Sequence, residues 1–329
     1  MKNKEHDTHL QSPLAARGPR PNVDVAVILV NFNSSAFTMD CLASIASFSV
    51  TSSAEGPSRH IVVVDNHSND HEHQLISGVQ DRFPGVTLIR SNVNLGFTGA
   101  NMLATQVVDA RYFFFLNNDT VFMNDVIGIL FRFMESDTAA GVCTAQMFDG
   151  NYSFTKSFHY FPSIVESVLG VGFARLLMPA RYPTNRKKYE TPVSVPYVTG
   201  SAMFCRKKAL AAVGGMDVTH FLYWEEQDLC LRVQKAGFAV FLVPQAQFVH
   251  FYGKSTARNY RIAAEEMISM FHFLRKHYSF LHRSSLRLFY FFKHLRKFYK
   301  GFDYVRLAFF VLAGAPMSAS LRYDQKMDL

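Results

Sequence analysis

The chain has 329 residues, of which 49% are hydrophobic and 18% are charged, so it can bury a large core and lacks the composition of a disordered polypeptide. No stretch reaches the roughly 18 uninterrupted apolar residues that a membrane-spanning helix needs, so none is predicted. The formal net charge is +8, and the excess lies in residues 271–329, which hold 11 Lys and Arg against three acids, while residues 1–270 hold 23 of each sign.

The two ends of the chain differ from its centre, residues 23–256, in which one α/β domain is expected. Residues 1–22 are polar and lack the apolar region of a signal peptide, which predicts a disordered leader. Residues 257–329 combine basic residues with aromatic runs such as Phe289–Phe292, which predicts a helical extension. This extension either lies on an anionic membrane surface or packs on the core with its lysines in solvent.

Strand and helix signals alternate from Val25 onward. The expected order is strand Val25–Val30, helix Phe37–Phe48, strand Ile61–Val64, helix Glu72–Arg82, strand Val86–Ile89, helix Phe97–Ala110 and strand Tyr112–Leu116. The last strand has no polar alternation, which is typical of a strand covered on both faces. The succession predicts an α/β fold with a mostly parallel central sheet flanked by helices.

The alternation weakens after Asp149. Residues Asn151–Pro196 mix aromatics, prolines and a basic cluster, and long loops are expected there. Regular elements are then expected in the order extended Val195–Cys205, helix Lys207–Val213, helix Glu226–Ala236, strand Ala239–Val243 and a second apolar strand at Phe248-Val249. Cys41, Cys143, Cys205 and Cys230 have no close pairs in the sequence, which favours free buried thiols over disulfides or zinc ligands.

Polar loops follow the predicted strands at their carboxyl ends, where open α/β sheets bind ligands. Asp119 is a hard oxygen ligand suited to a divalent cation, or else the cap of a helix near Asn124–Glu135. Asp65 could accept a hydrogen bond from a pyrimidine ring or a ribose hydroxyl. Gly96 would let the backbone approach a pyrophosphate. Each loop alone could also be ordinary turn chemistry.

An acidic cluster, Glu225-Glu226-Gln227-Asp228, follows the only tryptophan, Trp224, and opens a helix. Its acids could stabilise the amino end of the helix through the helix dipole. Alternatively, desolvation and the crowding of like charges could raise the pKa of one carboxylate toward that of a general base. His250 could be a metal ligand, although a single histidine after a strand is more often structural. The group His67, His71 and His73 is explained better by a solvated loop than by a metal site.

Seven segments, in order, resemble the family 2 inverting glycosyltransferases with the GT-A fold, and most of all their bacterial rhamnosyltransferase-like group. They are VILVNFN (27–33), VVDNHS (63–68), NVNLGFTGAN (92–101), LNNDT (116–120), YVTGSA (197–202), GGMD (214–217) and FLYWEEQDLCLR (221–232). The resemblance covers residues 24–256. It implies a nucleotide-sugar donor, a divalent cation such as Mg²⁺ or Mn²⁺, and inversion at the anomeric carbon.

The resemblance also implies a role for particular residues. The nucleotide sugar would be bound by Asn31, Asn33, Asp65, Asn94, Gly96, Asn101, Asn117 and Asn118, with Asp65 at the nucleobase. The metal ligands would be His250 and Asp119, the surviving acid of the family's Asp-x-Asp motif. Glu226 stands where the family has its catalytic base, with Glu225 beside it. Asp217, Tyr223 and Trp224 would shape the acceptor side.

The expected function is transfer of rhamnose or another hexose from a dTDP- or UDP-sugar to a glycan or polyprenyl-linked acceptor in cell-surface polysaccharide assembly. The protein is expected in the cytoplasm, bound peripherally to the cytoplasmic face of the inner membrane. Nucleic acid is not expected as a partner. Two alternatives remain. One is a catalytically silent nucleotide-sugar-binding module, suggested by Asn117 and Glu226. The other is a basic protein whose tail binds nucleic acid, suggested by an isoelectric point near 9.3.

Overall fold

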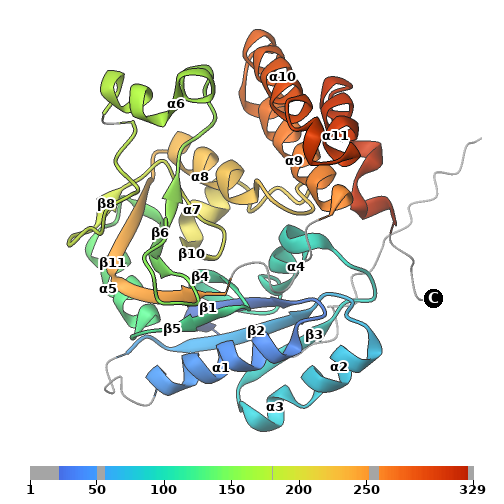
Figure 1. Ribbon diagram of the computed structural model, residues 1–329. Helices are drawn as coiled ribbons and strands as arrows, with labels where there is room; N and C mark the ends of the chain where they lie inside the picture. The colour runs from blue at the N-terminus through green and yellow to red at the C-terminus, as the bar shows by residue number, and fades with distance from the viewer. Residues whose placement is uncertain (1–21, 50–55, 180, 252–258, 325–329) are drawn as a thin grey trace, which may run out of the picture.

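The computed structural model describes residues 22–49, 56–179, 181–251 and 259–324, and a nine-stranded sheet lies at its centre (Figure 1). The strands follow one another across the sheet in the order β3 (Val86–Arg90), β2 (Arg59–Asp65), β1 (Asn22–Asn31), β4 (Asp109–Asn117), β10 (Ala202–Arg206), β6 (Ala140–Phe148), β11 (Ala239–His250) and β5 (Thr120–Phe122), with β8 (Val193–Ser194) paired to β11. The short strands β7 (Phe158–His159) and β9 (Tyr197–Val198) form a separate pair.

The first four strands of this order, β3, β2, β1 and β4, are parallel, which confirms the α/β fold with a mostly parallel sheet. Strand β10 runs antiparallel between β4 and β6, and β6 and β11 are parallel again. The parallel strands read as uninterrupted apolar runs because both of their faces are covered. Their carboxyl ends therefore meet at one edge of the sheet, where polar loops can converge.

Helices cover both faces of the sheet. One face carries α1 (Ser35–Ser49), α2 (Asp70–Ser77), α3 (Val79–Arg82) and α5 (Val126–Ser136), and the other carries α4 (Gly96–Ala104), α7 (Lys207–Ala212) and α8 (Glu225–Lys235). Strand β1 shows why two cores form: Val25 and Val27 belong to the first, and Ala26 and Ile28 to the second. Successive side chains of a strand point to opposite faces, so one apolar strand supplies both cores.

Several predicted elements differ in their limits. The helix expected over Glu72–Arg82 is divided at Gly78 into α2 and α3. The helix expected to reach Ala110 ends at Ala104, because β4 already begins at Asp109. Phe248-Val249 is the end of β11 and not a second strand, since β11 continues through a register irregularity between Val243 and Gln247 beside Pro244.

The segment Asn151–Pro196 was expected to form long loops, and this prediction is wrong in part. It contains the helix α6 (Ile164–Leu177), whose amino end is capped by Ser163. A left-handed Gly170, with φ of 83°, kinks this helix in its middle. Glycines and aromatics inside the segment therefore concealed a helix, because a kink interrupts the periodicity that identifies one.

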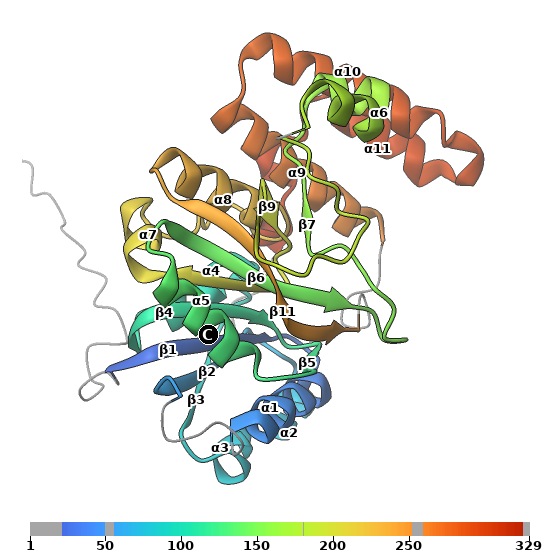
Figure 2. The ribbon, with the colours of Figure 1, turned by 90° about the vertical axis from the view of Figure 1, so that its left-hand side faces the viewer.

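The C-terminal region is helical, as the composition predicts. It consists of α9 (Tyr260–His277), α10 (Phe280–Leu295) and α11 (Phe302–Leu312), followed by short 3₁₀ turns. Helix α9 lies against the body, while α10 and α11 stand at the same end of the molecule as α6 (Figures 1 and 2). Within the parts of the chain that the structure describes, no helix has the length and apolar character that crossing a bilayer requires. The expected leader, residues 1–22, lies outside the described residues except for Asn22.

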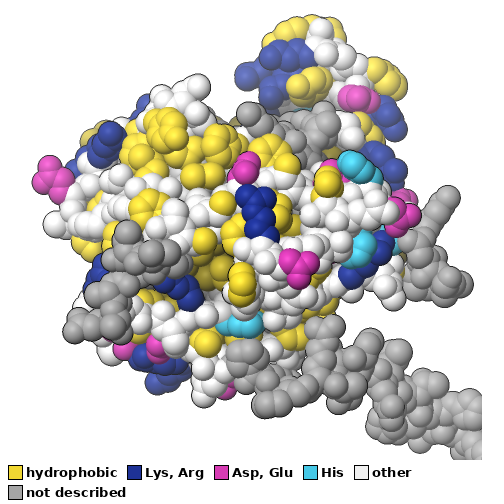
Figure 3. All heavy atoms as spheres, turned by 90° about the horizontal axis from the view of Figure 1, so that it is seen from below, with side chains coloured by type: hydrophobic (Ala, Val, Ile, Leu, Met, Phe, Trp, Pro, Cys, Tyr) yellow, Lys and Arg dark blue, Asp and Glu magenta, His cyan; other side chains and the backbone are white. Residues whose placement is uncertain are grey.

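The four cysteines are free and buried, as predicted. Burial raises the pKa of Cys41 to about 12, so its thiol stays protonated and acts as an apolar side chain. On the underside of the body, acidic and basic side chains are interspersed (Figure 3). This mixed surface agrees with the balanced charge of residues 1–270.

Candidate active site

A cleft of about 1240 Å³ opens at the carboxyl edge of the sheet. Of the candidate residues, those that line it are Asn94, Gly96, Asn117, Asn118, Asp119, Tyr223, Trp224, Glu225, Glu226 and His250. Others lie outside the lining: Asn31, Asn33, Asp65, Asn101 and Asp217. The structure thus brings the expected metal ligands and the expected base into one cavity. It places part of the expected nucleotide-binding set behind the cavity wall.

Asp119 and His250 form a pair at one end of the cleft, which we call the donor end because the resemblance implies nucleotide-sugar binding there. Asp119 follows β4, and His250 is the last residue of β11, so the two side chains come from strands far apart in sequence. The Nε2 atom of His250 lies 3.0 Å from Oδ1 of Asp119 and 3.4 Å from the amide nitrogen of Asn117. Asp119 does not cap α5, because Asp125 does so by accepting from the backbone N–H of Gly128.

A buried polar network lies beneath this pair. Asn118 donates to the hydroxyls of Ser34 and Thr38, each at 2.8 Å. Thr38 in turn donates to Asn31, whose amide also reaches Ser68. Asn31 is therefore a structural link between loops. Buried polar groups are stable only when hydrogen-bonded, so this network fixes the donor-end loops in one arrangement.

Asp65 is fully buried and bonded within the protein. Its Oδ2 atom lies 2.6 Å from Nδ1 of His73, and its Oδ1 atom accepts from the backbone N–H of Ser68. His73 therefore pairs with Asp65, which refines the expectation of a merely solvated loop. Among the cleft residues of this region is Asn66, which donates to Asn94 at 2.9 Å.

Gly96 has φ of +71°, and a Cβ there would meet the backbone oxygen of Phe221 at 2.3 Å. The N–H of Phe97 donates to that oxygen at 2.8 Å. The backbone of Gly96 is therefore approached closely by Phe221. This contact joins the amino end of α4 to the aromatic loop that precedes α8. Asn101, one turn later, is buried and donates to the carbonyl of Phe97. Asn33, with φ of 51°, accepts from Asn69 and joins two loops in the same way.

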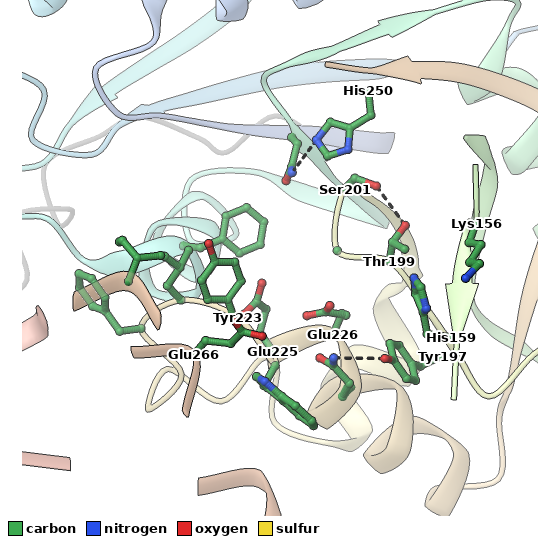
Figure 4. A pocket seen from close by; sticks show the side chains of 18 of the residues that line it. Lys156, His159, Tyr197, Thr199, Ser201, Tyr223, Glu225, Glu226, His250 and Glu266 are labelled. Atoms are coloured by element: carbon green, nitrogen blue, oxygen red, sulfur yellow. Dashed lines mark hydrogen bonds between the residues drawn. The ribbon is translucent and has the colours of Figure 1, made fainter. Parts of the chain in front are cut away.

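Glu225 and Glu226 occupy the opposite wall of the cleft (Figure 4). Burial raises the pKa of Glu225 to about 7. Burial, together with the charge of Glu225, raises the pKa of Glu226 well above the usual range. A Cβ on Gly200 would lie 3.6 Å from both carboxyl groups, so a bare backbone leaves them open to the cavity. These are the properties of a carboxylate that exchanges a proton near neutral pH.

The residues around Glu226 hold it in place. Tyr223 and Trp224 both have left-handed backbones, with φ of 69° and 70°, an unfavourable conformation for bulky residues that turns the chain sharply into α8. Gln227 bridges Glu226 and Tyr197. In the amide orientation that satisfies both ends, its nitrogen donates to Glu226 at 3.0 Å and its oxygen accepts from the Tyr197 hydroxyl.

Several cleft residues were not anticipated. Glu266, from α9, lines the cleft beside Glu225 (Figure 4). Lys156, Arg175 and Arg186 add positive charge from the segment between β6 and β10. The basic run containing Arg186 was a visible signal, but nothing in the periodicity of α9 marks Glu266, because its place depends on how a distant helix packs.

Asp217, expected on the acceptor side, points into a different cluster. Its Oδ2 atom lies 3.0 Å from His272 and 2.7 Å from the ammonium of Lys276, and the hydrogen bond from His272, with that of Lys276, lowers the pKa of Asp217 far below its usual range. Asp217, His220 and His272 are close enough together to hold a metal ion. Lys276 already supplies the positive charge that balances Asp217, so we interpret the cluster as an ionic link to α9.

Asp228 strengthens the same link. It is fully buried and bonded by Arg232 at 2.6 Å, by Lys276 at 2.9 Å and by His277 at 2.7 Å. Burial opposes its charge, but the bond from His277 and the charge of Arg232 outweigh this and lower the pKa of Asp228. Helix α8, which carries Glu226, is therefore held by α9. The first helix of the C-terminal region is part of the active-site scaffold.

Residues 26–214 match the family model described as glycosyl transferase family 2. The chain belongs to glycosyl transferase family 2. Among curated relatives, an N-acetylglucosaminyl-diphospho-decaprenol L-rhamnosyltransferase of Mycobacterium tuberculosis is 29% identical over 215 residues, which cover 60% of this chain and 68% of the relative. Rhamnosyltransferase WbbL of Escherichia coli is 26% identical over 203 residues, which cover 58% and 72%. These similarities confirm the resemblance to the rhamnosyltransferase-like group.

Two solved structures share the fold. GalNAc-T7 with UDP, GalNAc and Mn²⁺ superposes with a TM-score of 0.57 at 13% identity, over 77% of this chain and 48% of that one, so the match spans about half of GalNAc-T7. The mannosyltransferase PcManGT from Pyrobaculum calidifontis, with GDP-Man and Mn²⁺, gives a TM-score of 0.52 at 13% identity, over 90% and 77%. At such identities the likeness concerns the fold, and it confirms the GT-A architecture.

Proposed function

We propose that this family 2 glycosyltransferase moves a sugar, with inversion, from a nucleotide-diphosphate donor to a lipid-linked glycan acceptor. One observation carries the proposal: Asp119 with His250, and Glu225 with Glu226, lie on facing walls of a single cleft. An inverting displacement needs a site that stabilises the departing diphosphate on one side of the anomeric carbon and a base on the other. The cleft offers both.

The donor end fits a divalent cation, Mg²⁺ or Mn²⁺. Asp119 would offer it a carboxylate oxygen and His250 an imidazole nitrogen, and these two atoms, Oδ1 of Asp119 and Nε2 of His250, lie 3.0 Å apart, close enough for one ion to contact both. Asn117 would contribute a weaker, neutral contact. When bound, the cation would neutralise charge that develops on the diphosphate. Both GT-A neighbours were solved with Mn²⁺, which supports this assignment.

Asn66, Asn94 and Asn118 are among the polar residues of the donor end that line the cleft, and they support binding of the nucleotide there. The role of Asp65 as the nucleobase ligand stays a prediction. To serve, it would have to exchange the bond from His73 or Ser68 for one from the base.

At the acceptor end, Glu226 would take the proton from an acceptor hydroxyl as that oxygen attacks the anomeric carbon. The bond between this carbon and the diphosphate oxygen breaks in the same step, so the configuration inverts and no covalent intermediate forms. Glu226 then passes its proton to solvent. The raised pKa of Glu226 suits a base that must capture this proton. Tyr223 and Trp224 would stack on the acceptor sugar.

The substrates are proposed from the relatives' names. The mycobacterial relative is a rhamnosyltransferase that acts on N-acetylglucosaminyl-diphospho-decaprenol. We infer rhamnose or another hexose on dTDP or UDP as donor, and a polyprenyl-diphosphate-linked sugar as acceptor, in cell-surface polysaccharide assembly. A lipid-linked acceptor would place the enzyme at the cytoplasmic face of the inner membrane.

The tail is the proposed membrane contact, through α10 and α11 but not α9. Helix α9 packs on the catalytic body, whereas Phe292, Phe298 and Phe309 are exposed among lysines and arginines. A basic surface with exposed aromatics is typical of segments that bind anionic bilayers. Truncation after Arg275 would remove Lys276 and His277, which bond Asp228 in the active-site scaffold. Truncation after Leu295 keeps these two residues but removes Leu307 and Val311, which are buried in the core that includes α9, so replacing the exposed Phe292, Phe298 and Phe309 is the better test of the membrane contact.

The test uses purified full-length protein, a panel of nucleotide sugars and a polyprenyl-diphosphate-linked acceptor. We expect one donor to be consumed only with a divalent cation, and the product to have inverted configuration. A donor that binds but is never turned over would indicate the silent module. Retention on nucleic acid, with no retention on anionic vesicles, would favour the second alternative, a basic protein whose tail binds nucleic acid.

A further inference from the structure

Helix α6 exposes an apolar surface that nothing in the described structure covers. Val168 is 63% exposed, Leu169 56% and Leu176 78%. Ile164, Phe173 and Leu177 are also exposed. A cluster of large apolar side chains in solvent marks an interaction site more often than chance, whereas single exposed leucines do not.

The apolar surface of α6 continues into the basic tail. Figures 1 and 2 both place α6 beside α10, and the side chains of Glu166 and Lys293 are near enough to influence each other's charge. On the tail, Phe280, Leu281, Leu288 and Phe292 are exposed close to Arg283 and Lys293. One end of the molecule therefore combines apolar side chains on two elements with cations of α10 such as Arg283 and Lys293.

The other side of α6 lines the active-site cleft. Glu166, Val171, Gly172 and Arg175 belong to the cleft wall, as does Tyr290 from α10. Arg175 is fixed there, because it donates to the carbonyl of Tyr182 at 3.0 Å and to the hydroxyl of Tyr160 at 3.1 Å. A single helix thus presents apolar residues outward and a positioned guanidinium inward.

We propose that α6 docks on an anionic lipid bilayer together with α10 and α11, and that Arg175 receives the diphosphate of a lipid-linked acceptor entering beside α6. The bilayer is the occupant that this surface fits, because it offers an apolar interior to the leucines and anionic headgroups to the tail. The guanidinium suits a phosphate through paired N–H donors. The role of Arg175 in acceptor binding rests on the proposed function, whereas the docking of α6 on a bilayer does not.

The docking is tested by flotation of the full-length protein with vesicles of equal parts phosphatidylcholine and phosphatidylglycerol. The variant carries Leu169→Gln and Leu176→Gln, and the matched control carries Leu75→Gln on α2, where Leu75 is 51% exposed. We expect the α6 variant to bind about tenfold more weakly than wild type at low and at high salt, because apolar insertion is not screened. The control should bind as wild type does. An α6 variant that binds like the control would overturn the docking.

The Arg175 subsite is tested by steady-state kinetics with a polyprenyl-diphosphate-linked acceptor. Arg175→Gln should raise the KM for the acceptor about tenfold, because one charge-assisted hydrogen bond is lost. The KM for the donor should stay unchanged. Arg175→Lys should recover most of the loss. Equal effects on both KM values would mean a structural role and would overturn the subsite. If wild type transfers no sugar, the proposed function fails, while the vesicle result still decides the docking.

Discussion

The two ends of the cleft are built in different ways. At the donor end, Asp119, Asn118 and His250 sit at strand ends and make hydrogen bonds to neighbours, so the loops have one arrangement before any ligand arrives. At the acceptor end, Glu225 and Glu226 are desolvated beside each other, and Oε2 of Glu225 has no hydrogen-bond partner among the described residues. The donor end is therefore suited to hold a cation in one place, and the acceptor end is suited to accept and release a proton.

The supports of the two ends differ as well. The donor end belongs to the sheet, whose strands are buried on both faces. The acceptor end is assembled from α6, α8 and α9, and there the ionic contacts of buried Asp228 join α8 to α9 beside their shared apolar core. We therefore expect substitutions at the donor end to change turnover alone, and substitutions at the acceptor end to change turnover, pH dependence or folding.

Loss of the donor-end carboxylate should have the largest effect. Asp119→Ala should lower cation-dependent donor turnover about 1000-fold, because a bound cation contributes several kcal/mol to the transition state and each 1.36 kcal/mol is tenfold. The backbone bond from Phe251 to the carbonyl of residue 119 survives the change, so the melting temperature should stay near that of wild type. Asp70→Asn, on exposed α2, is the control. Turnover that persists in excess chelator would contradict the metal role.

Removing the charge of Asp228 should destabilise the packing of α8 against α9. Asp228→Asn should lower the free energy of unfolding by about 3 kcal/mol, since buried cations lose their counter-charge. Chemical denaturation measures this. The control is Asp303→Asn, which breaks the exposed pair with Arg306 and should cost less than about 1 kcal/mol. A similar cost for both variants would show that the link between α8 and α9 contributes little.

Replacing the base should separate binding from chemistry. Glu226→Gln should bind the donor normally and transfer sugar about 100-fold more slowly, the usual contribution of a general base. Glu225→Gln tests the assignment within the pair, because both carboxyls face Gly200. If Glu225→Gln is the slow variant and Glu226→Gln is nearly normal, the two roles are reversed.

The contrast between the ends also explains what the sequence can predict. Asp119, Asn117 and Asn118 follow an apolar strand whose pattern is local, so their place at the sheet edge could be inferred from the strand alone. Glu226 was found through its motif and its unusual charge crowding. Asp65 and Asn101 fit the motif too, but burial behind the cleft wall depends on how the loops pack, and one sequence does not encode that in any local pattern.

The acceptor end was harder to predict for the same reason. The kink at Gly170 hid α6, and Glu266, Arg175 and the partners of Asp217 reach the site through contacts between segments far apart in sequence. The two interpretations of the tail were also incomplete. Composition offered a membrane segment or a packed element, and the structure shows packing: α9 lies on the body, and α10 and α11 bury Leu286, Leu307 and Val311 in the same core while exposing aromatic residues on their other side. The membrane contact stays a prediction.

The smallest effect, and the most specific to the acceptor end, concerns Gln227. Its amide nitrogen donates to Glu226 at 3.0 Å and favours the charged carboxylate. Gln227→Leu removes this donor, so the already raised pKa of Glu226 should rise further. The base must be deprotonated, so the rate of transfer falls as pH drops through that pKa, and the midpoint of the pH profile should move up by about one unit.

This shift distinguishes Gln227 from a residue that only fills space. At neutral pH the variant should be about tenfold slower than wild type, and alkaline pH should restore much of the rate, because only the proton affinity of Glu226 has changed. Tyr197→Phe is the control, since it removes the far end of the bridge and leaves the donor to Glu226 in place. A variant that is slower at every pH, with its midpoint unmoved, would mean that Gln227 positions the helix and does not tune the base.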